Sequence, residues 1–164
     1  MIVVLMGVTG AGKTTIGRML AQDLSWQFAD ADNFHSPANV EKMRLGIPLN
    51  DADRAPWIAS LRAAMERWLA KKQNAVLACS ALKKVYRDQL DMGPETRFVY
   101  LKGSYDLIRQ RLDRRHGHFA NEQLLASQFA ALEEPGDAIT VDIAGSTDEI
   151  VREINRRLSL EQSR

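Results

Sequence analysis

The sequence predicts an α/β fold, with a parallel sheet of about five strands and helices on both faces. Two observations predict it. Short apolar runs rich in β-branched residues recur along the chain, and stretches with helical spacing of apolar residues separate them. The runs are Ile2 to Met6, Trp26 to Ala29, Ala75 to Ala78, Phe98 to Leu101 and Ile139 to Ile143. Ligands of such sheets bind at the carboxyl ends of the strands, so the residues after each run are candidates for a functional site.

Length and composition indicate one ordinary globular domain over residues 1–164. Apolar residues make up 45% of the chain and charged residues 26%, as is typical of a protein with one packed core. The formal net charge of +1 favours neither nucleic acid nor an anionic membrane as a partner. The single cysteine, Cys79, excludes an internal disulfide, and no apolar run has the length of a membrane span. We therefore expect a cytoplasmic protein.

The first run leads into a glycine-rich stretch, Gly7 to Thr14, that matches the pattern G-x-x-x-x-G-K-S/T of a phosphate-binding loop. Its glycines let successive backbone N–H groups turn inward around an anion. Lys13 can reach the outer phosphates of a nucleotide, and the Thr14 hydroxyl can ligate magnesium. A chance turn is the alternative, but the preceding strand and following helix favour a phosphate loop. We expect nucleotide contacts from Gly7, Val8, Thr9, Gly10, Ala11, Gly12, Lys13, Thr14 and Thr15.

Two carboxylates, Asp30 and Asp32, follow the second run. On an extended segment, side chains at i and i+2 point the same way. One carboxylate can face a magnesium ion, and the other can accept the proton of an acceptor hydroxyl during phosphoryl transfer. Taken alone, two such acids would indicate a solvated loop. Their position beside the phosphate loop favours the functional interpretation.

An insertion of helical character, about residues 33–74, separates the second run from the third and is the expected acceptor-binding region. Ser36 and Pro37 predict the cap and first turn of a helix. Val40 and Met43 are the expected apolar face of this helix.

A second helix in the insertion is predicted to begin near Pro56, after a polar turn. Arg54 stands at the end of this turn. Its planar guanidinium can hold a carboxylate or a hydroxyl-rich acceptor, and a surface salt bridge with Asp51 or Asp53 explains it equally well. His35 is a weaker candidate for an acceptor contact.

The third run ends in Cys79 and Ser80. Neither residue has the G-x-S-x-G surroundings or the neighbouring histidine of an activated nucleophile, so Cys79 is interpreted as a packing residue. Ser80 and Lys83 are expected acceptor contacts at the end of a strand. Lys84 and Arg87 are interpreted as a solvated face.

A helix that Ser104 caps follows the fourth run, and cationic side chains crowd its far end around Gly117. They are Arg109, Arg111, Arg114, Arg115, His116 and His118. Attraction to the helix macrodipole is one explanation. The other is a lid, about residues 111–122, that brings arginine over a transferring phosphoryl group. The last run leads to the turn Ala144-Gly145, which could lie against an adenine.

In order along residues 1–145, the chain contains GVTGAGKTT, DADNFHSPANVEKMRLGIPLNDADRAPW, CSALKKVYRD, FVYLKG, RLDRRHGHF and SQFAALEEP. Together these segments resemble the gluconokinase family, the small ATP-dependent kinases of D-gluconate. The second segment follows the pattern DxDxxHxxxNxxKMxxGxPLxDxDRxPW, which is far more specific than the phosphate loop. The resemblance implies the fold of the nucleoside monophosphate and shikimate kinases, with an acceptor-binding region and a lid. It also implies ATP and Mg²⁺ as cofactors, 6-phosphogluconate as product, and a homodimer.

Residue roles carry over from the resemblance by matching positions. Lys13, Asp32 and Arg115 are the implied catalytic residues, and Thr14 and Asp30 are the implied metal contacts. Arg111 and Arg115 match the lid arginines that contact the nucleotide. The implied substrate-binding residues are Asp32, His35, Arg54, Ser80, Lys83, His118 and Gln128, of which His118 and Gln128 match the pattern without an assigned role.

One departure from the family pattern is Ala31, where the family commonly has glycine. Its methyl group could crowd the acceptor or only stiffen the end of the strand. The nearest alternative function is a kinase of the same fold with shikimate or a nucleotide as acceptor, and the segment from Asp30 to Trp57 separates the two. A nucleotide-dependent switch is a further alternative, which lacks support because the chain has no guanine-reading N-K-x-D motif.

Overall fold

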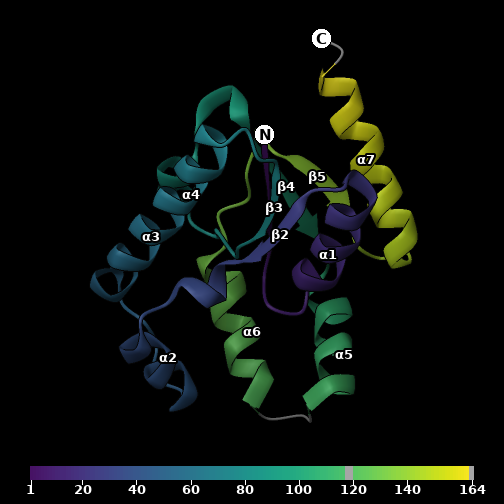
Figure 1. The fold of residues 1–164 in the computed structure, drawn as a ribbon. Helices are drawn as coiled ribbons and strands as arrows, with labels where there is room; N and C mark the ends of the chain where they lie inside the picture. Colours follow the sequence, from purple (N-terminus) through teal and green to yellow (C-terminus); the bar gives the residue numbers. More distant parts are fainter. Residues whose placement is uncertain (117–119, 163–164) are drawn as a thin grey trace.

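The computed structural model describes residues 1–116 and 120–162, and it has the predicted α/β architecture (Figure 1). Within these residues five parallel strands form one sheet in the order β2-β3-β1-β4-β5. The strands are β1 (Ile2–Met6), β2 (Gln27–Asp30), β3 (Ala75–Ala78), β4 (Thr96–Lys102) and β5 (Ile139–Asp142). β1 is central, with Ile2 in register with Ala75 on one side and Thr96 on the other. The phosphate loop therefore leaves the middle of the sheet.

Helices cover both faces of the sheet. They are α1 (Lys13–Leu24), α2 (Pro37–Arg44), α3 (Asp51–Ala70), α4 (Lys84–Leu90), α5 (Tyr105–His116), α6 (Ala120–Ala131) and α7 (Thr147–Gln162). In Figure 1, α3 and α4 lie on one side of the sheet, and α1 and α7 lie on the other. α2, α5 and α6 extend below the carboxyl ends of the strands in the same view. Among the helices of residues 1–116 and 120–162, none combines the length and the apolar character that a membrane-spanning helix requires.

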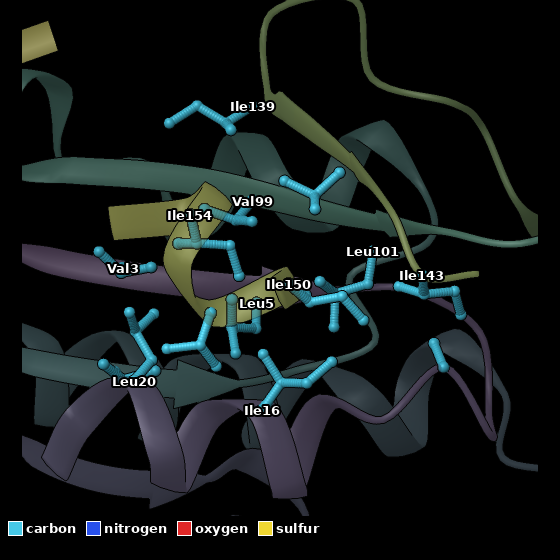
Figure 2. Close-up of a cluster of buried hydrophobic side chains, with 14 of the residues drawn as sticks. Val3, Leu5, Ile16, Leu20, Val99, Leu101, Ile139, Ile143, Ile150 and Ile154 are labelled. Atoms are coloured by element: carbon cyan, nitrogen blue, oxygen red, sulfur yellow. The ribbon is translucent and has the colours of Figure 1, made fainter. Parts of the chain in front are cut away.

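The core consists of two apolar clusters, one on each face of the sheet, because side chains along a strand alternate between its faces. Val3 and Leu5 of β1 belong to the cluster with α1 and α7. Figure 2 shows this cluster, where Ile16 and Leu20 of α1 and Ile150 and Ile154 of α7 pack around the two β1 side chains. The other β1 side chains, Ile2, Val4 and Met6, belong to the cluster with α3.

The second helix of the insertion, α3, begins at Asp51 and not near Pro56 as the sequence predicted. The cause is a reciprocal cap. The Asn50 side chain accepts a hydrogen bond from the Asp53 N–H at 2.8 Å, and the Asp53 carboxylate accepts one from the Asn50 N–H at 3.1 Å. This capping box stabilises the first turn, so the helix forms with Pro56 inside it.

The first helix of the insertion, α2, begins as predicted, with the Ser36 hydroxyl accepting from the Asn39 N–H at 3.2 Å. Its expected apolar face is wrong, because Val40 and Met43 are 49% and 41% exposed. The buried side chain is Asn39, whose amide donates to the Asp53 carbonyl at 2.8 Å. α2 is thus joined to α3 by polar contacts, and its apolar side chains stay at the surface.

Candidate active site

The phosphate loop connects β1 to α1 and takes a conformation that glycine permits. Gly10 and Gly12 have φ angles of 79° and 95°, in the left-handed region that other residues rarely adopt. A Cβ at Gly10 would lie 2.9 Å from the Leu112 side chain of α5, so α5 packs directly against the loop. The loop ends at the N-terminus of α1, where free N–H groups and the helix dipole favour an anion.

Lys13 lies folded over this loop. Its ammonium donates to the carbonyls of Gly7 at 3.0 Å and Val8 at 2.9 Å. Burial lowers the pKa of Lys13, and the nearby acidic groups, Asp32 and Asp30 among them, oppose this shift. The ammonium therefore lies in a recess beside two carboxylates, which a bound phosphate would join as a third anionic group.

Thr14 and Asp30 meet at the entrance of the same recess. The Thr14 hydroxyl donates to the Asp30 carboxylate at 3.0 Å. Hydroxyl and carboxylate oxygens are ligands that magnesium accepts alongside phosphate oxygens and water. The two side chains predicted as metal contacts are thus brought together, and their chemistry fits a magnesium ion bound with a nucleotide.

Asp32 does not lie on an extended segment, so that prediction is wrong. It belongs to a short 3₁₀ turn, residues Ala31–Phe34, because the Asp30 carboxylate accepts from the Asp32 N–H at 3.0 Å and caps the turn. Burial, with the charge of Asp30, raises the pKa of Asp32, while His35 and Lys13 act in the opposite direction. A carboxylate with a raised pKa accepts a proton more readily, which suits a general base.

These residues line one recess of about 370 Å³, which we call the acidic cleft. Its lining includes Lys13, Thr14, Asp30, Asp32, Ser80 and Gln128. Met43 of α2 and Leu124 of α6 form part of its rim. Lys13 and Asp32 therefore face a common space, as a phosphoryl donor and a hydroxyl acceptor require.

Trp57 anchors the turn that carries Asp32. Its indole N–H donates to the Ala31 carbonyl at 2.7 Å, and its ring stacks on His35 with centroids 4.5 Å apart. The Ala31 side chain is 2% exposed and packs in the α3 cluster with Trp57. The methyl group that replaces the family's glycine thus points into the core and not into the cleft. The sequence signal for Trp57 was its place at the end of the DRxPW segment.

His35 and Arg54 lie together near this anchor. Burial lowers the pKa of His35, and the charge of Arg54 adds to that shift. The sequence left open whether Arg54 pairs with Asp51 or with Asp53. In the structure it pairs with Asp51, at a nitrogen–oxygen distance of 3.7 Å. The Arg54 guanidinium carbon also lies 5.9 Å from the centroid of the Tyr86 ring. The other candidate partner, Asp53, pairs instead with Lys42 at 2.8 Å.

The segment after β3 brings Ser80 into the acidic cleft. Cys79 is buried, and burial raises the pKa of its thiol to about 12, so it is a packing residue. Lys83 directly precedes α4. Arg87, predicted as a solvated residue, is only 7% exposed and donates to the carbonyls of Ala81 and Leu82. That prediction is wrong because helical spacing does not reveal that the loop folds back over α4.

A second recess of about 350 Å³, the α7 cleft, lies on the other side of the phosphate loop. Its lining includes Gly12, Arg111, Arg114, Gly145, Thr147 and Ile150. Arg111 is held there by a hydrogen bond to the Ile143 carbonyl. Both clefts share Gly10 and Gly12 of the phosphate loop and Thr15 of α1. A nucleotide with its base in the α7 cleft would therefore direct its phosphates toward the acidic cleft.

α6 lines one side of the acidic cleft through Leu124 and Gln128. The Gln128 side chain accepts from the Thr9 N–H at 3.0 Å and ties this helix to the phosphate loop. The role of Gln128 that the sequence left unassigned is therefore at least to hold two parts of the site together. His118 and the side chain of Arg115 lie outside the described part of the structure.

Comparisons with known proteins agree with this geometry. The shikimate kinase family model matches residues 9–159. The chain is 43% identical to a probable gluconokinase of Xenopus tropicalis, over 99% of this chain and 98% of that protein. It is 45% identical to a gluconokinase of Gluconobacter oxydans, over 96% and 91%. A solved gluconokinase from Sinorhizobium meliloti 1021 superposes with a TM-score of 0.81 at 40% identity, covering 92% of this chain and 87% of that one. The chain belongs to the gluconokinase family, within the shikimate kinase type of P-loop kinases.

Proposed function

We propose that this protein is a gluconokinase that transfers the γ-phosphate of ATP to the primary hydroxyl of D-gluconate and forms 6-phosphogluconate. The observation that carries the proposal is the position of the phosphate loop between two clefts, one lined by α7 and one by Asp30 and Asp32. The family membership supports the choice of acceptor, because the relatives at 43% and 45% identity are named as gluconokinases.

The positions of the residues support the following roles. Lys13 exchanges its two loop carbonyls for phosphate oxygens, and the N–H groups at the start of α1 hold the phosphates. Thr14 and Asp30 are placed to hold magnesium, which would neutralise charge on the phosphate oxygens. Asp32 orients the acceptor hydroxyl and takes its proton, since its raised pKa brings it closer to neutral pH. We assign Arg115 to the lid, where it closes over the transferring group together with Arg111.

The acceptor would lie between the Asp32 turn and the segment that follows β3. We assign His35, Arg54, Ser80 and Lys83 to this space, and of these four Ser80 lines the acidic cleft itself. His118 and Gln128 are assigned to the same side. In this assignment Arg54 and Lys83 would supply positive charge, which suits the carboxylate of a sugar acid. The acceptor-binding region covers about residues 33–74 and the lid about residues 111–122 of a single domain. We also propose that the protein is a homodimer and that it acts in the cytoplasm.

A panel of acceptors tests it. ADP release would be measured in a coupled assay with gluconate, shikimate, AMP or no acceptor, and the product with gluconate would be identified by phosphorus NMR. We expect turnover with gluconate and a phosphate monoester as product. Turnover with shikimate or AMP alone would make the protein a different kinase of the same fold. Slow ADP release that no acceptor accelerates would indicate a nucleotide-dependent switch.

A further inference from the structure

The loop between β3 and α4, residues 79–83, contacts both halves of the active site. Its Ser80 carbonyl accepts from the Gly7 N–H at 3.2 Å, at the first residue of the phosphate loop. Ser80 itself lines the acidic cleft, and Lys83 stands at the opposite end of the loop, next to α4. The position of this loop therefore sets the distance between bound phosphates and any acceptor that Ser80 and Lys83 contact.

The backbone of this loop needs external support. Ala81 has a φ of 44°, a left-handed conformation that is unfavourable for a residue with a Cβ. Such a residue keeps its conformation only where surrounding contacts impose it. Ala81 directly follows Ser80, so relaxation of Ala81 would move Ser80 relative to the phosphate loop.

Arg87 of α4 provides this support from beneath the loop. One nitrogen of its guanidinium donates to the Ala81 carbonyl and to the Leu82 carbonyl, both at 2.9 Å. The side chain is only 7% exposed, and burial of a guanidinium is unfavourable unless hydrogen bonds compensate for lost water. The two described hydrogen bonds of this buried arginine both go to the 79–83 loop. They can form only while the loop keeps its present conformation, so Arg87 stabilises that conformation.

The far half of the loop has a second support, which limits the damage that loss of Arg87 would cause. The Leu82 carbonyl also accepts from the Glu133 N–H at 2.9 Å, and the Glu133 carboxylate accepts from the Lys84 N–H at 2.6 Å. Without the Arg87 side chain, α4 would thus keep the hydrogen bond from its first residue, Lys84, to Glu133. The loop would also stay connected to the segment after α6 through Leu82. The part that depends most on Arg87 is Ala81, beside Ser80.

We propose that Arg87 is a positioning residue of the acceptor site. It does not touch substrate; it holds the 79–83 loop so that Ser80 and Lys83 meet the acceptor at the correct distance from the phosphate loop. The inference rests on the proposed function, because it assigns these two residues to the acceptor side.

The test compares Arg87→Met and Arg87→Lys with the wild-type protein. For Arg87→Met we expect kcat/KM for gluconate to fall roughly tenfold to hundredfold, as displacements near 1 Å do at active sites, with KM for ATP and affinity for a fluorescent ATP analogue unchanged. Lysine keeps the charge and can donate to a carbonyl, but its flexible ammonium side chain differs in reach and shape from the guanidinium, so Arg87→Lys should recover part of the loss.

Arg62→Met is the matched control. Arg62 of α3 also donates from its guanidinium to a backbone carbonyl, that of Gln89 in α4 at 2.7 Å, but it lies away from the loop. It also pairs with Glu66 at 3.1 Å, an i,i+4 contact within α3. We expect Arg62→Met to lower the unfolding temperature slightly and to leave both KM values at the wild-type level.

The outcomes separate the inference from the proposed function. If folded Arg87→Met shows only a lower unfolding temperature, with wild-type kinetics for gluconate, Arg87 is structural and the inference fails. If Arg87→Met does not fold, an unchanged KM and kcat for gluconate in Arg87→Lys overturns it instead. An equal loss of ATP affinity and gluconate turnover also overturns it, because the effect would not be confined to the acceptor. A wild-type protein without gluconate-dependent turnover refutes the proposed function itself.

Discussion

Replacing Trp57 by phenylalanine tests whether one hydrogen bond positions the acidic turn. The change removes the indole N–H that reaches the Ala31 carbonyl at 2.7 Å and leaves a buried acceptor without this donor. Such a loss costs about 1–3 kcal/mol, and the smaller ring forfeits about 1 kcal/mol of packing. We expect the free energy of unfolding to fall by about 2–4 kcal/mol, and the unfolding temperature by roughly 5–15 °C for a domain of this size.

The same change should reduce turnover. The Ala31 carbonyl belongs to the peptide that joins Ala31 to Asp32, so a released turn moves the carboxylate away from the acceptor. Stacking with His35 would also weaken. We expect kcat with gluconate to fall at least roughly tenfold, since small displacements of reacting groups have effects of this order. Thermal unfolding and the coupled ADP assay would measure the two effects on one preparation.

Trp68→Phe provides the control. Trp68 lies on the same helix, α3, and packs partly buried against the same core cluster, but it has no role in the Asp32 turn. We expect a smaller loss of stability and wild-type kinetics. The reasoning is refuted if Trp57→Phe loses stability and keeps the wild-type kcat. It is also refuted if both variants lose the same fraction of kcat, because the effect would then follow stability and not the turn.

Three further predictions concern the site. Asp32→Asn should keep ATP affinity and lose turnover by roughly a hundredfold or more. Because partial burial and the charge of Asp30 raise the pKa of Asp32, the wild-type kcat/KM should rise with pH over a range above that of an isolated aspartate, and the variant should lack this rise. Thr14→Val should raise the magnesium concentration for half-maximal activity roughly tenfold or more. A magnesium titration in the coupled assay measures this concentration. If it is unchanged, Thr14 does not belong to the metal site. Burial raises the pKa of Cys79 from 9.0 to about 12, so stability that depends on the neutral thiol is present below pH 9 and is lost as the pH rises through about 12; urea unfolding of Cys79→Ala should show a flatter decline over this range than the wild type.

The elements of the fold could be predicted from local pattern, but their arrangement could not. β1 and β3 are short apolar runs that are buried along their whole length, and runs this compact identify buried parallel strands without reference to the rest of the chain. The order β2-β3-β1-β4-β5 depends on contacts between segments far apart in sequence, such as Val4 with Leu77 and with Phe98. Helix ends depend on competing local interactions. The Asn50–Asp53 cap places the start of α3 at Asp51, before Pro56, although a proline is itself a signal for the first turn of a helix.

The site also has parts that could be predicted from local sequence and parts that could not. The phosphate loop was predictable because eight contiguous residues determine its shape. The Asp32 turn could not be predicted in this way. It depends on a hydrogen bond from the Asp32 N–H to the Asp30 carboxylate, and an extended continuation of the strand is an alternative with similar local support. Arg87 was missed because its partners are carbonyls, which every residue carries and no side-chain pattern marks. Val40 and Met43 were misplaced because apolar spacing predicts a buried face, and the α2 fold instead uses the polar Asn39.

The two sides of the site rest on different cores, and β1 joins them. Its odd residues, Val3 and Leu5, pack with α1 and α7 below the α7 cleft, whereas Ile2, Val4 and Met6 pack with α3, which holds Trp57 and the Asp32 turn. A core substitution on one side should therefore act first on the ligand of that side. Since both sets of side chains project from one five-residue strand that runs directly into the phosphate loop, a shift of β1 itself would move phosphates and acceptor together. β1 therefore links the phosphate loop that follows it to both core clusters, including the one that contains Trp57 of the Asp32 turn.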